Sequence, residues 1–427
     1  KNKIKIYNIM SISWDEQLKI VASDGNAGDQ FGHSTDIYGD YAIIGANEKM
    51  VNGEGSTGQA YIFKKADGAE TWTLQATLNH SDQNNSDRFG ISVSIYKNYA
   101  IIGAYQAHPA SGSDEVGAAY IFKKDDGAET WTQQAKLLAS DAAASDQFGE
   151  SVSIYGDYAV VGAQANHESA TVTYSGSAYI FKKDENAETW SEVNKLVPSD
   201  GEGQHARFGE AVSIHGDYAA IGEKGDTSSG SVFIYKKGVD GNGNERWNEQ
   251  MKIYPSDLGG KGRGMGFGGS VSLEGDYVLI GAKDDPHDEQ WYQSDYGSAY
   301  IYKRDQGAET WSRKAKLVSS DPADDDCFGE TVSLSNNYAV ISAPSEDDNS
   351  KSNSGSVYFF KKEVDENGDE TWTEKSKVYA SDTDTNDYLG GADIGNWQRR
   401  ERIGIFGNYA IVGAFKNESS YIFKLTG

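Results

Sequence analysis

The sequence is poor in cysteine, proline and long apolar runs, and each shortage excludes a class of protein. Cys327 is the only cysteine among the 427 residues, so no disulfide can form within the chain. Six prolines leave little room for polyproline linkers. No apolar run reaches the roughly 18 residues that span a bilayer as a helix, so we expect no direct membrane insertion. The opening segment KNKIKIYNIM begins with lysine but lacks the apolar block and cleavage site of a signal peptide.

Positive charge is also scarce. Lysine and arginine number 39 against 65 aspartates and glutamates, which gives a net charge of −26. A chain this acidic is repelled by nucleic acid and by anionic lipid, so we expect no nucleic-acid partner. The charge suits a soluble surface, a cation-binding surface or a basic partner.

Signatures of catalysis are missing as well. The seven histidines show no metal-ligand spacing, and no Gly-x-Ser-x-Gly elbow occurs. The glycine-rich stretch 259–269 lies between predicted strands with no helix after it, which favours a flexible loop over a nucleotide site. The sequence therefore predicts no catalytic residues and favours a non-enzymatic role. It leaves open an enzyme whose carboxylates, tyrosines and histidines assemble only in the folded chain.

What the sequence has in abundance is repetition. Phenylalanine–glycine pairs stand at Phe31-Gly32, Phe89-Gly90, Phe148-Gly149, Phe208-Gly209, Phe267-Gly268 and Phe328-Gly329, and a degenerate Leu389-Gly390 follows. The steps are 58, 59, 60, 59, 61 and 61 residues. This period indicates one unit of about sixty residues written seven times. Such units form one continuous body rather than separate domains.

The third copy shows four strand-like segments. Residues 148–154 (FGESVSI) alternate, and residues 158–163 (YAVVGA) form a continuous apolar run, typical of a strand buried on both faces. Residues 177–183 (SAYIFKK) and a segment from Trp190 to Leu196 follow. No stretch shows a sustained 3.6-residue period, so we expect almost no helix.

Short turns join the first two strands of every copy. They are Gly39-Asp40, Lys97-Asn98, Gly156-Asp157, Gly216-Asp217, Gly275-Asp276, Asn336-Asn337 and Gly407-Asn408. These residues tolerate the positive φ that a two-residue hairpin requires, so the strands are predicted to be antiparallel. The sequence thus predicts an all-β, seven-bladed propeller with four antiparallel strands in each blade.

The chain ends predict how the ring closes. The last copy stops at its third strand, Tyr421 to Lys424, and the segment from Trp14 to Ile20 resembles a fourth strand. We expect residues 12–22 and 382–427 to share blade 7, with a single propeller domain over 12–427 and an extension at 1–11. Seven tryptophans occupy equivalent outer-strand positions and are predicted to pack between blades: Trp14, Trp72, Trp131, Trp190, Trp247, Trp311 and Trp372.

The recurring Phe-Gly, followed about ten residues later by a segment such as Tyr-Ala-Ile-Ile-Gly-Ala, resembles the FG-GAP repeat. The resemblance covers residues 12–427. It implies the propeller of integrin α-subunit heads and of microbial and fungal surface proteins, and with it an extracellular or surface location. The family's calcium loop lies between the first two strands. Here that connection is only Tyr-Gly-Asp-Tyr, for example at 38–41, so a microbial or viral relative fits better than a true integrin.

Paired aspartates five residues apart mark five connections between copies. The pairs are Asp24 and Asp29, Asp82 and Asp87, Asp141 and Asp146, Asp321 and Asp326, and Asp382 and Asp387. Two carboxylates with loop carbonyls are candidate ligands for calcium. The alternative is structural, with Ser-Asp capping a turn and the second aspartate accepting backbone N–H bonds. We expect no required cofactor, and calcium is the one candidate ion.

The connections between the second and third strands and those between blades lie on one face and vary most from copy to copy, so ligand binding is predicted there. The longest second-to-third connection, 283–296, holds His287, Trp291, Tyr292 and Tyr296, and equivalent connections hold Tyr105 and Tyr174. Aromatic side chains beside carboxylates can stack on sugars or anchor a protein. The alternative is a loop that folds over its own aromatic residues.

A basic cluster stands out in the seventh copy, where 395–402 reads GNWQRRER. Trp397, Arg399, Arg400 and Arg402 are candidate contacts for an acidic partner or a neighbouring subunit, or they pair with acids of adjacent blades.

Three functions remain compatible with these patterns. The favoured one is a non-enzymatic surface or extracellular adhesion module that binds a protein or a carbohydrate through its variable loops. A carbohydrate-active lyase or hydrolase with a site in the central channel is the second. The third is a structural component that assembles into a larger filament or shell.

Overall fold

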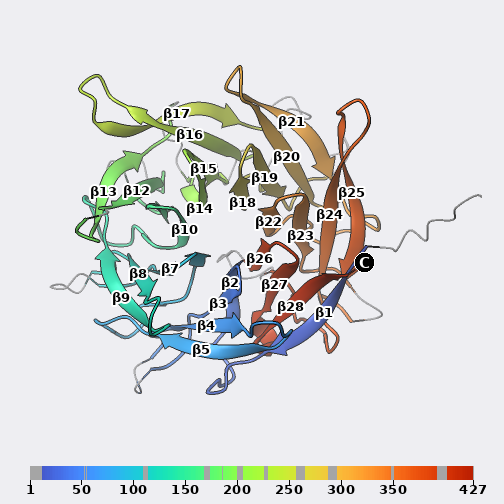
Figure 1. The fold of residues 1–427 in the computed structure, drawn as a ribbon, viewed down its shortest axis with the longest axis horizontal. Coiled ribbons are helices and arrows are strands. Elements are labelled where there is room, and N and C mark those ends of the chain that lie inside the picture. Colours follow the sequence, from blue (N-terminus) through green and yellow to red (C-terminus); the bar gives the residue numbers. More distant parts are fainter. Residues whose placement is uncertain are drawn as a thin grey trace, which may run out of the picture.

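The computed structural model is a ring of β-sheets arranged around a central axis (Figure 1). It describes residues 12–51, 53, 55–108, 114–167, 174–184, 186–199, 205–225, 229–255, 265–286, 296–347, 351–391 and 402–426. Within these ranges the strands form seven four-stranded sheets, and every neighbouring pair of strands within a sheet is antiparallel. The predicted seven-bladed propeller is therefore confirmed. None of the helices in the described ranges is long and apolar enough to cross a membrane.

Each blade runs from an inner strand to an outer one. Blade 1 consists of β2 (Phe31–Tyr38), β3 (Tyr41–Ala46), β4 (Gln59–Lys65) and β5 (Trp72–Leu78). Blade 2 consists of β6 (Val93–Tyr96), β7 (Tyr99–Ala104), β8 (Ala118–Lys124) and β9 (Trp131–Leu137). Blade 3 consists of β10 (Ser151–Tyr155), β11 (Tyr158–Ala163), β12 (Ser177–Lys183) and β13 (Trp190–Leu196). Blade 4 consists of β14 (Phe208–His215), β15 (Tyr218–Glu223), β16 (Ser231–Val239) and β17 (Glu245–Ile253). Blade 5 consists of β18 (Val271–Glu274), β19 (Tyr277–Ala282), β20 (Ser298–Asp305) and β21 (Thr310–Leu317). Blade 6 consists of β22 (Val332–Ser335), β23 (Tyr338–Ala343), β24 (Ser356–Val364) and β25 (Glu370–Val378).

Blade 7 joins the two ends of the chain. It consists of β26 (Ile403–Phe406), β27 (Tyr409–Ala414), a 3-10 turn η2 (Phe415–Asn417), β28 (Ser419–Thr426) and, as its outer strand, β1 (Ser13–Ile20). Strand β1 pairs with β28, with Trp14 opposite Leu425. Figure 1 shows the blue N-terminal strand beside the red C-terminal strands. The predicted ring closure is thus confirmed, while the extension at 1–11 lies outside the described residues.

Two-residue turns and buried middle strands follow from the sequence as expected. Gly39 and Lys97 begin such turns with φ of 61° and 53°, which is the left-handed region that these hairpins need. Strands such as β11 are buried along nearly their whole length, because a neighbouring blade covers each face. The apolar core consists of seven clusters, one between each pair of adjacent blades.

The Phe-Gly pair packs one blade closely against the previous one. Phe148 is 0% exposed and meets Tyr179 of its own blade edge-on, with ring centroids 5.5 Å apart, and it forms a β-bridge with Gly117 of the previous blade. Gly149 has φ of 90°, and a Cβ added to it would lie 2.2 Å from the carbonyl oxygen of Ala118 in the previous blade. Only glycine combines this conformation with so close an approach, which explains why the pair recurs in register.

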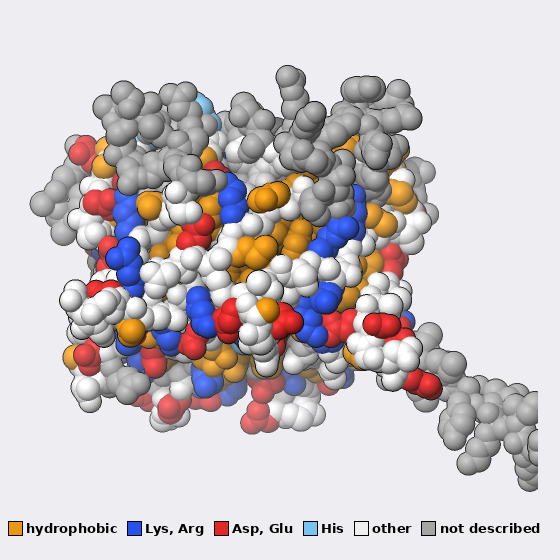
Figure 2. Space-filling view, turned by 90° about the horizontal axis from the view of Figure 1, so that it is seen from above, with side chains coloured by type: hydrophobic (Ala, Val, Ile, Leu, Met, Phe, Trp, Pro, Cys, Tyr) orange, Lys and Arg blue, Asp and Glu red, His pale blue; other side chains and the backbone are white. Residues whose placement is uncertain are grey.

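The outer parts of adjacent blades are joined by a tyrosine, a tryptophan, a lysine and a glutamate. At all seven junctions a tyrosine of the second strand meets the outer-strand tryptophan of the next blade edge-on, as Tyr277 meets Trp372 at 6.2 Å. This confirms the predicted packing of the seven tryptophans. At six junctions a lysine of the third strand pairs with a glutamate two residues before that tryptophan, as Lys303 pairs with Glu370 at 2.5 Å. We call this Lys–Glu pair the clasp. Figure 2 shows blue and red side chains interspersed along the wall of the ring.

Candidate functional site

The first aspartate of each predicted pair is held by a tyrosine and a lysine. Asp141 accepts hydrogen bonds from the Tyr179 hydroxyl and the Lys195 ammonium group, both at 2.8 Å. Burial raises the pKa of Asp141, but these two donors outweigh it and hold the pKa below its usual value. The same tyrosine contact recurs at Asp24, Asp82, Asp321 and Asp382, at 2.7 to 3.0 Å.

The second aspartate of each pair closes the turn that leads into Phe-Gly. Asp146 is 2% exposed and accepts the backbone N–H of Ala143 at 2.9 Å. Asp29, Asp87, Asp326 and Asp387 are also buried and each accepts the N–H of the residue three positions earlier. Burial raises the pKa of Asp326 to about 6. Both roles match the structural interpretation of the pairs.

No group of three or more histidine, cysteine, aspartate or glutamate side chains within the described ranges is placed to hold a metal ion. The oxygens of the aspartate pairs receive phenol, ammonium and amide donors, which compete directly with a cation. Calcium binding at these pairs stays a prediction, and these contacts are what a bound ion would displace.

Of the aromatic ligand candidates that lie within the described residues, Tyr174 is the one that is exposed. It lies between β11 and β12, with 44% of its surface exposed. Its ring stacks on His205 at 5.4 Å and 19°, and His167 meets it edge-on at 5.1 Å. The Arg207 N–H donates to the Tyr174 carbonyl oxygen at 3.1 Å, which ties this loop to the connection that enters blade 4. We call His167, Tyr174 and His205 the loop patch.

The loop patch joins residues that no local motif relates. His167 and Tyr174 belong to one connection and His205 to the next, and both histidines are exposed. Sequence analysis found Tyr174 but missed the histidines, because their proximity depends on two loops that meet on the same face. We call this face, which carries the connections between second and third strands and between blades, the loop face.

The other aromatic candidates are placed differently. Tyr105 directly follows β7 and is only 6% exposed, which leaves little of its surface to a ligand, and its role as a ligand contact stays a prediction. Tyr296 is half-buried two residues before β20. His287, Trp291 and Tyr292 lie outside the described residues.

The basic cluster of the seventh copy is only partly described. Trp397, Arg399 and Arg400 lie outside the described residues. Arg402 is 1% exposed, and its Nε donates to the His33 carbonyl oxygen at 2.8 Å while its guanidinium lies 4.5 Å from the Phe415 ring centroid. Its predicted role as a partner contact is therefore wrong, because the side chain is buried between blades 7 and 1.

A cavity of about 280 Å³ lies on the axis of the ring, and the inner strands of all seven blades line it. Serines face it from most blades, and each of four accepts a backbone N–H from the next blade, as Ser213 does from Leu273 at 2.9 Å. Blade 1 has Asp36 at this level, which accepts the N–H groups of Ile95 and Ile37, both at 2.8 Å. The position of Asp36 inside the channel removes it from bulk solvent and raises its pKa to about 6.

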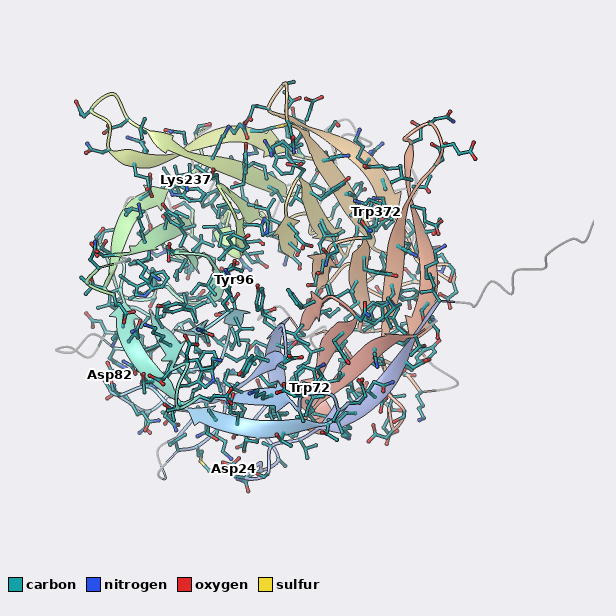
Figure 3. The ribbon with its side chains drawn as sticks, viewed as in Figure 1. Asp24, Trp72, Asp82, Tyr96, Lys237 and Trp372 are labelled. Carbon is teal, nitrogen blue, oxygen red and sulfur yellow. The ribbon has the colours of Figure 1, made fainter. Side chains whose placement is uncertain are left out.

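Aromatic rings crowd one end of this cavity, where the inner strands turn into the second strands. Phe406, Tyr38, Tyr96, Tyr155 and His215 follow one another around five consecutive blades, with neighbouring centroids 4.1 to 4.9 Å apart. Glu274 and Ser335 occupy the same position in the two remaining blades. We call these seven residues the channel mouth, and Figure 3 shows Tyr96 at the inner edge of the ring.

Burial and mutual contact change the acidity of the channel mouth. Burial, together with the neighbouring Tyr96 hydroxyl, raises the pKa of Tyr155 to about 12. Burial lowers the pKa of His215 and raises the pKa of Glu274. Sequence analysis missed this site, although each member directly precedes a turn between the first two strands.

A family comparison supports this architecture. The FG-GAP repeat model matches residues 14–63, 72–122, 131–181, 190–235, 247–302 and 311–360. Each match begins at an outer-strand tryptophan and ends in a third strand. The degenerate seventh copy is outside these matches, although it forms a blade in the structure.

No curated protein matches the sequence. Among solved structures, Sqt1 from Saccharomyces cerevisiae aligns with a TM-score of 0.48 at 10% identity, over 97% of this chain and 100% of that one. The Pan2 WD40 domain from Neurospora crassa aligns with a TM-score of 0.49 at 8% identity, over 96% and 95%. A protein from Lactobacillus plantarum is 16% identical over 66% of this chain and 68% of its own, with a TM-score of 0.40.

The repeat matches extend over more than half of the sequence, and they coincide with blades that the structure shows one by one. The chain therefore belongs to the FG-GAP repeat family.

Proposed function

We propose that this protein is a recognition module at the cell or particle surface that binds a protein ligand through its loop face. Propellers of FG-GAP repeats serve in general as protein-interaction modules, which supports the broad class. The finer statement rests on the loop patch, where an exposed tyrosine is held between two histidines that come from different loops.

The loop patch has the properties of an interaction anchor. Tyrosine is enriched at binding hot spots because it offers a large rigid surface with one polar end. Contact with His205 and His167 restricts the Tyr174 ring before any ligand arrives, so less side-chain entropy is lost on binding. A net charge of −26 favours a basic partner, because opposite charges accelerate encounter.

A binding comparison of three proteins tests this proposal. The wild type, Tyr174→Ala and Val364→Ala are immobilised and exposed to surface extracts and to a glycan array. Val364 is 57% exposed at the end of β24, next to a hairpin on the opposite face, so it controls for general surface effects. We expect a protein that is retained by the wild type and Val364→Ala and bound about tenfold more weakly by Tyr174→Ala.

Two results would overturn the proposal. Equal retention of the protein by all three variants would remove the loop patch from the interface. Binding to glycans alone, with loss in Tyr174→Ala, would replace the protein ligand with a carbohydrate.

A further inference from the structure

The channel mouth lies away from the loop patch, and the proposed protein ligand does not use it. It is bordered by the turns between first and second strands, whereas the loop patch belongs to the opposite set of connections. Its cavity of about 280 Å³ is slightly smaller than most ligand pockets. A group of one ring fits such a space better than a folded segment does.

The aromatic rings form a fan that is open on one side. Neighbouring ring planes differ by 41° to 59°, as expected for upright rings related by steps around a sevenfold axis. The short centroid distances mean that adjacent rings cover each other's faces. Only the two ends of the series, Phe406 and His215, have a face turned away from the fan.

The open side is a slot two blades wide. Phe406 and His215 flank it, each with a single aromatic neighbour in the described part of the chain. Between them lie Glu274 and Ser335. A flat ligand that enters this slot meets an aromatic face on either side and polar groups between them.

The polar groups of the slot offer both a donor and an acceptor. The Gly275 N–H donates to Nδ1 of His215 at 2.9 Å, so the neutral imidazole carries its proton on Nε2 and can donate it. The Asn336 N–H donates to Oε2 of Glu274 at 2.5 Å. No described residue donates to Oε1, which remains able to accept a ligand hydroxyl.

We propose that the slot between Phe406 and His215 binds one neutral pyranose unit. A pyranose has an apolar face of C–H groups that can stack on an aromatic ring, and hydroxyls that both donate and accept hydrogen bonds. Glu274 receives a sugar hydroxyl, and His215 donates to another. An organic cation suits the site less well, because Lys97 lies 5.1 Å from the Tyr96 ring centroid and Lys362 also acts on Glu274.

Saturation-transfer NMR on the full chain tests this proposal. The probes are the methyl glycosides of glucose, galactose, mannose and N-acetylglucosamine at millimolar concentration, with choline and arginine amide as cationic alternatives. We expect transfer to at least one glycoside and an affinity about tenfold weaker in Glu274→Gln, which removes a charged acceptor without changing its shape. Tyr174→Ala should bind as the wild type does.

The variant Phe406→Ala provides a second test of the binding site. Because this variant loses a stacking surface, it should bind the same glycoside more weakly. If Phe406→Ala fails to fold, Glu274→Gln still tests the site, provided that its unfolding midpoint equals that of the wild type. Transfer to no glycoside would overturn the proposal, as would unchanged binding in Glu274→Gln or transfer to the cations alone. The proposal of a pyranose site and the proposal of a protein-binding loop face can be refuted independently, because each variant alters only one of the two sites.

Discussion

Six of the seven blade junctions carry the clasp, and the junction between blades 6 and 7 does not. At the others a lysine of the third strand meets a glutamate of the next blade, as Lys303 meets Glu370. Lys361 is the equivalent lysine of blade 6, and within the described residues it makes no ion pair. Its ammonium group lies 6.0 Å from the Tyr338 ring centroid, the longest of the seven equivalent distances.

The difference arises from where the chain opens. The glutamate of each clasp stands at the end of the connection from the third strand or at the start of the fourth strand, two residues before tryptophan. In blade 7 this connection is replaced by the chain ends, and Ile12 occupies the position two residues before Trp14. The junction keeps its other contacts, since Trp14 meets Tyr338 at 5.6 Å and the Ser381 N–H donates to Glu16 at 2.7 Å. Within the described residues, the closing junction therefore lacks one ion pair that the other six junctions have, but it keeps the aromatic contact and the hydrogen bond.

The largest expected effect comes from removing the closing strand. We predict that deletion of residues 1–20 lowers the free energy of unfolding of the whole ring by at least about 5 kcal/mol, because a buried tryptophan alone contributes 3–5. Trp14 is 2% exposed and stacks on Phe359 at 4.3 Å. Urea unfolding followed by tryptophan fluorescence measures the change.

The matched control for this deletion removes residues 1–11 only and leaves β1 in place. It should unfold at nearly the wild-type midpoint. A shorter chain without β1 that unfolds at the wild-type midpoint would contradict the view that this strand closes the ring.

A second difference near the chain ends concerns Asp36. Most blades have serine at this level, but blade 7 has Gly404, which offers no side chain to the Ile37 N–H of the next blade. Asp36 accepts that N–H itself at 2.8 Å. The carboxylate accepts both N–H groups because Oδ1 receives that of Ile37 and Oδ2 receives that of Ile95. The aspartate thus replaces the hydrogen bond that blade 7 cannot accept from the Ile37 N–H. Its consequence is that an ionisable carboxyl group lies inside the channel.

We predict that Asp36→Asn, which cannot ionise, removes a pH dependence of the wild-type stability, although it replaces one of the two accepting oxygens with a donor group. The native pKa of about 6 lies above the ordinary value of 3.8, so the native state holds a proton that the unfolded state releases between these values. Wild-type stability should therefore fall as pH rises from about 4 to 6, by up to about 3 kcal/mol. Urea midpoints at pH 4 and pH 7.5 measure the loss, which Asp36→Asn should abolish. An equal pH dependence in both proteins would assign the fall to other groups.

The sequence was sufficient for the strands, the ring and its closure, because each is recorded in a pattern that repeats seven times. It was insufficient for the sites. Tyr38 and Tyr96 belong to equivalent positions 58 residues apart and become neighbours only when blades 1 and 2 pack together. Arg402 resembled its charged neighbours in sequence, but its place at the start of β26 turns the side chain inward.

The smallest expected effect is the most direct test of the missing clasp. Ile12→Glu places a carboxylate where the other six junctions have one, and pairing with Lys361 should stabilise the protein by about 0.5 kcal/mol, as exposed ion pairs do. The gain should disappear in high salt, because mobile ions screen the pair. Ile12→Gln controls for the loss of the isoleucine, and a double-mutant cycle with Lys361→Ala isolates the pairwise energy. Glu370→Gln at a clasped junction should lose a comparable amount. A gain in Ile12→Glu that persists without Lys361 would mean that the seventh junction differs from the others by more than one carboxylate.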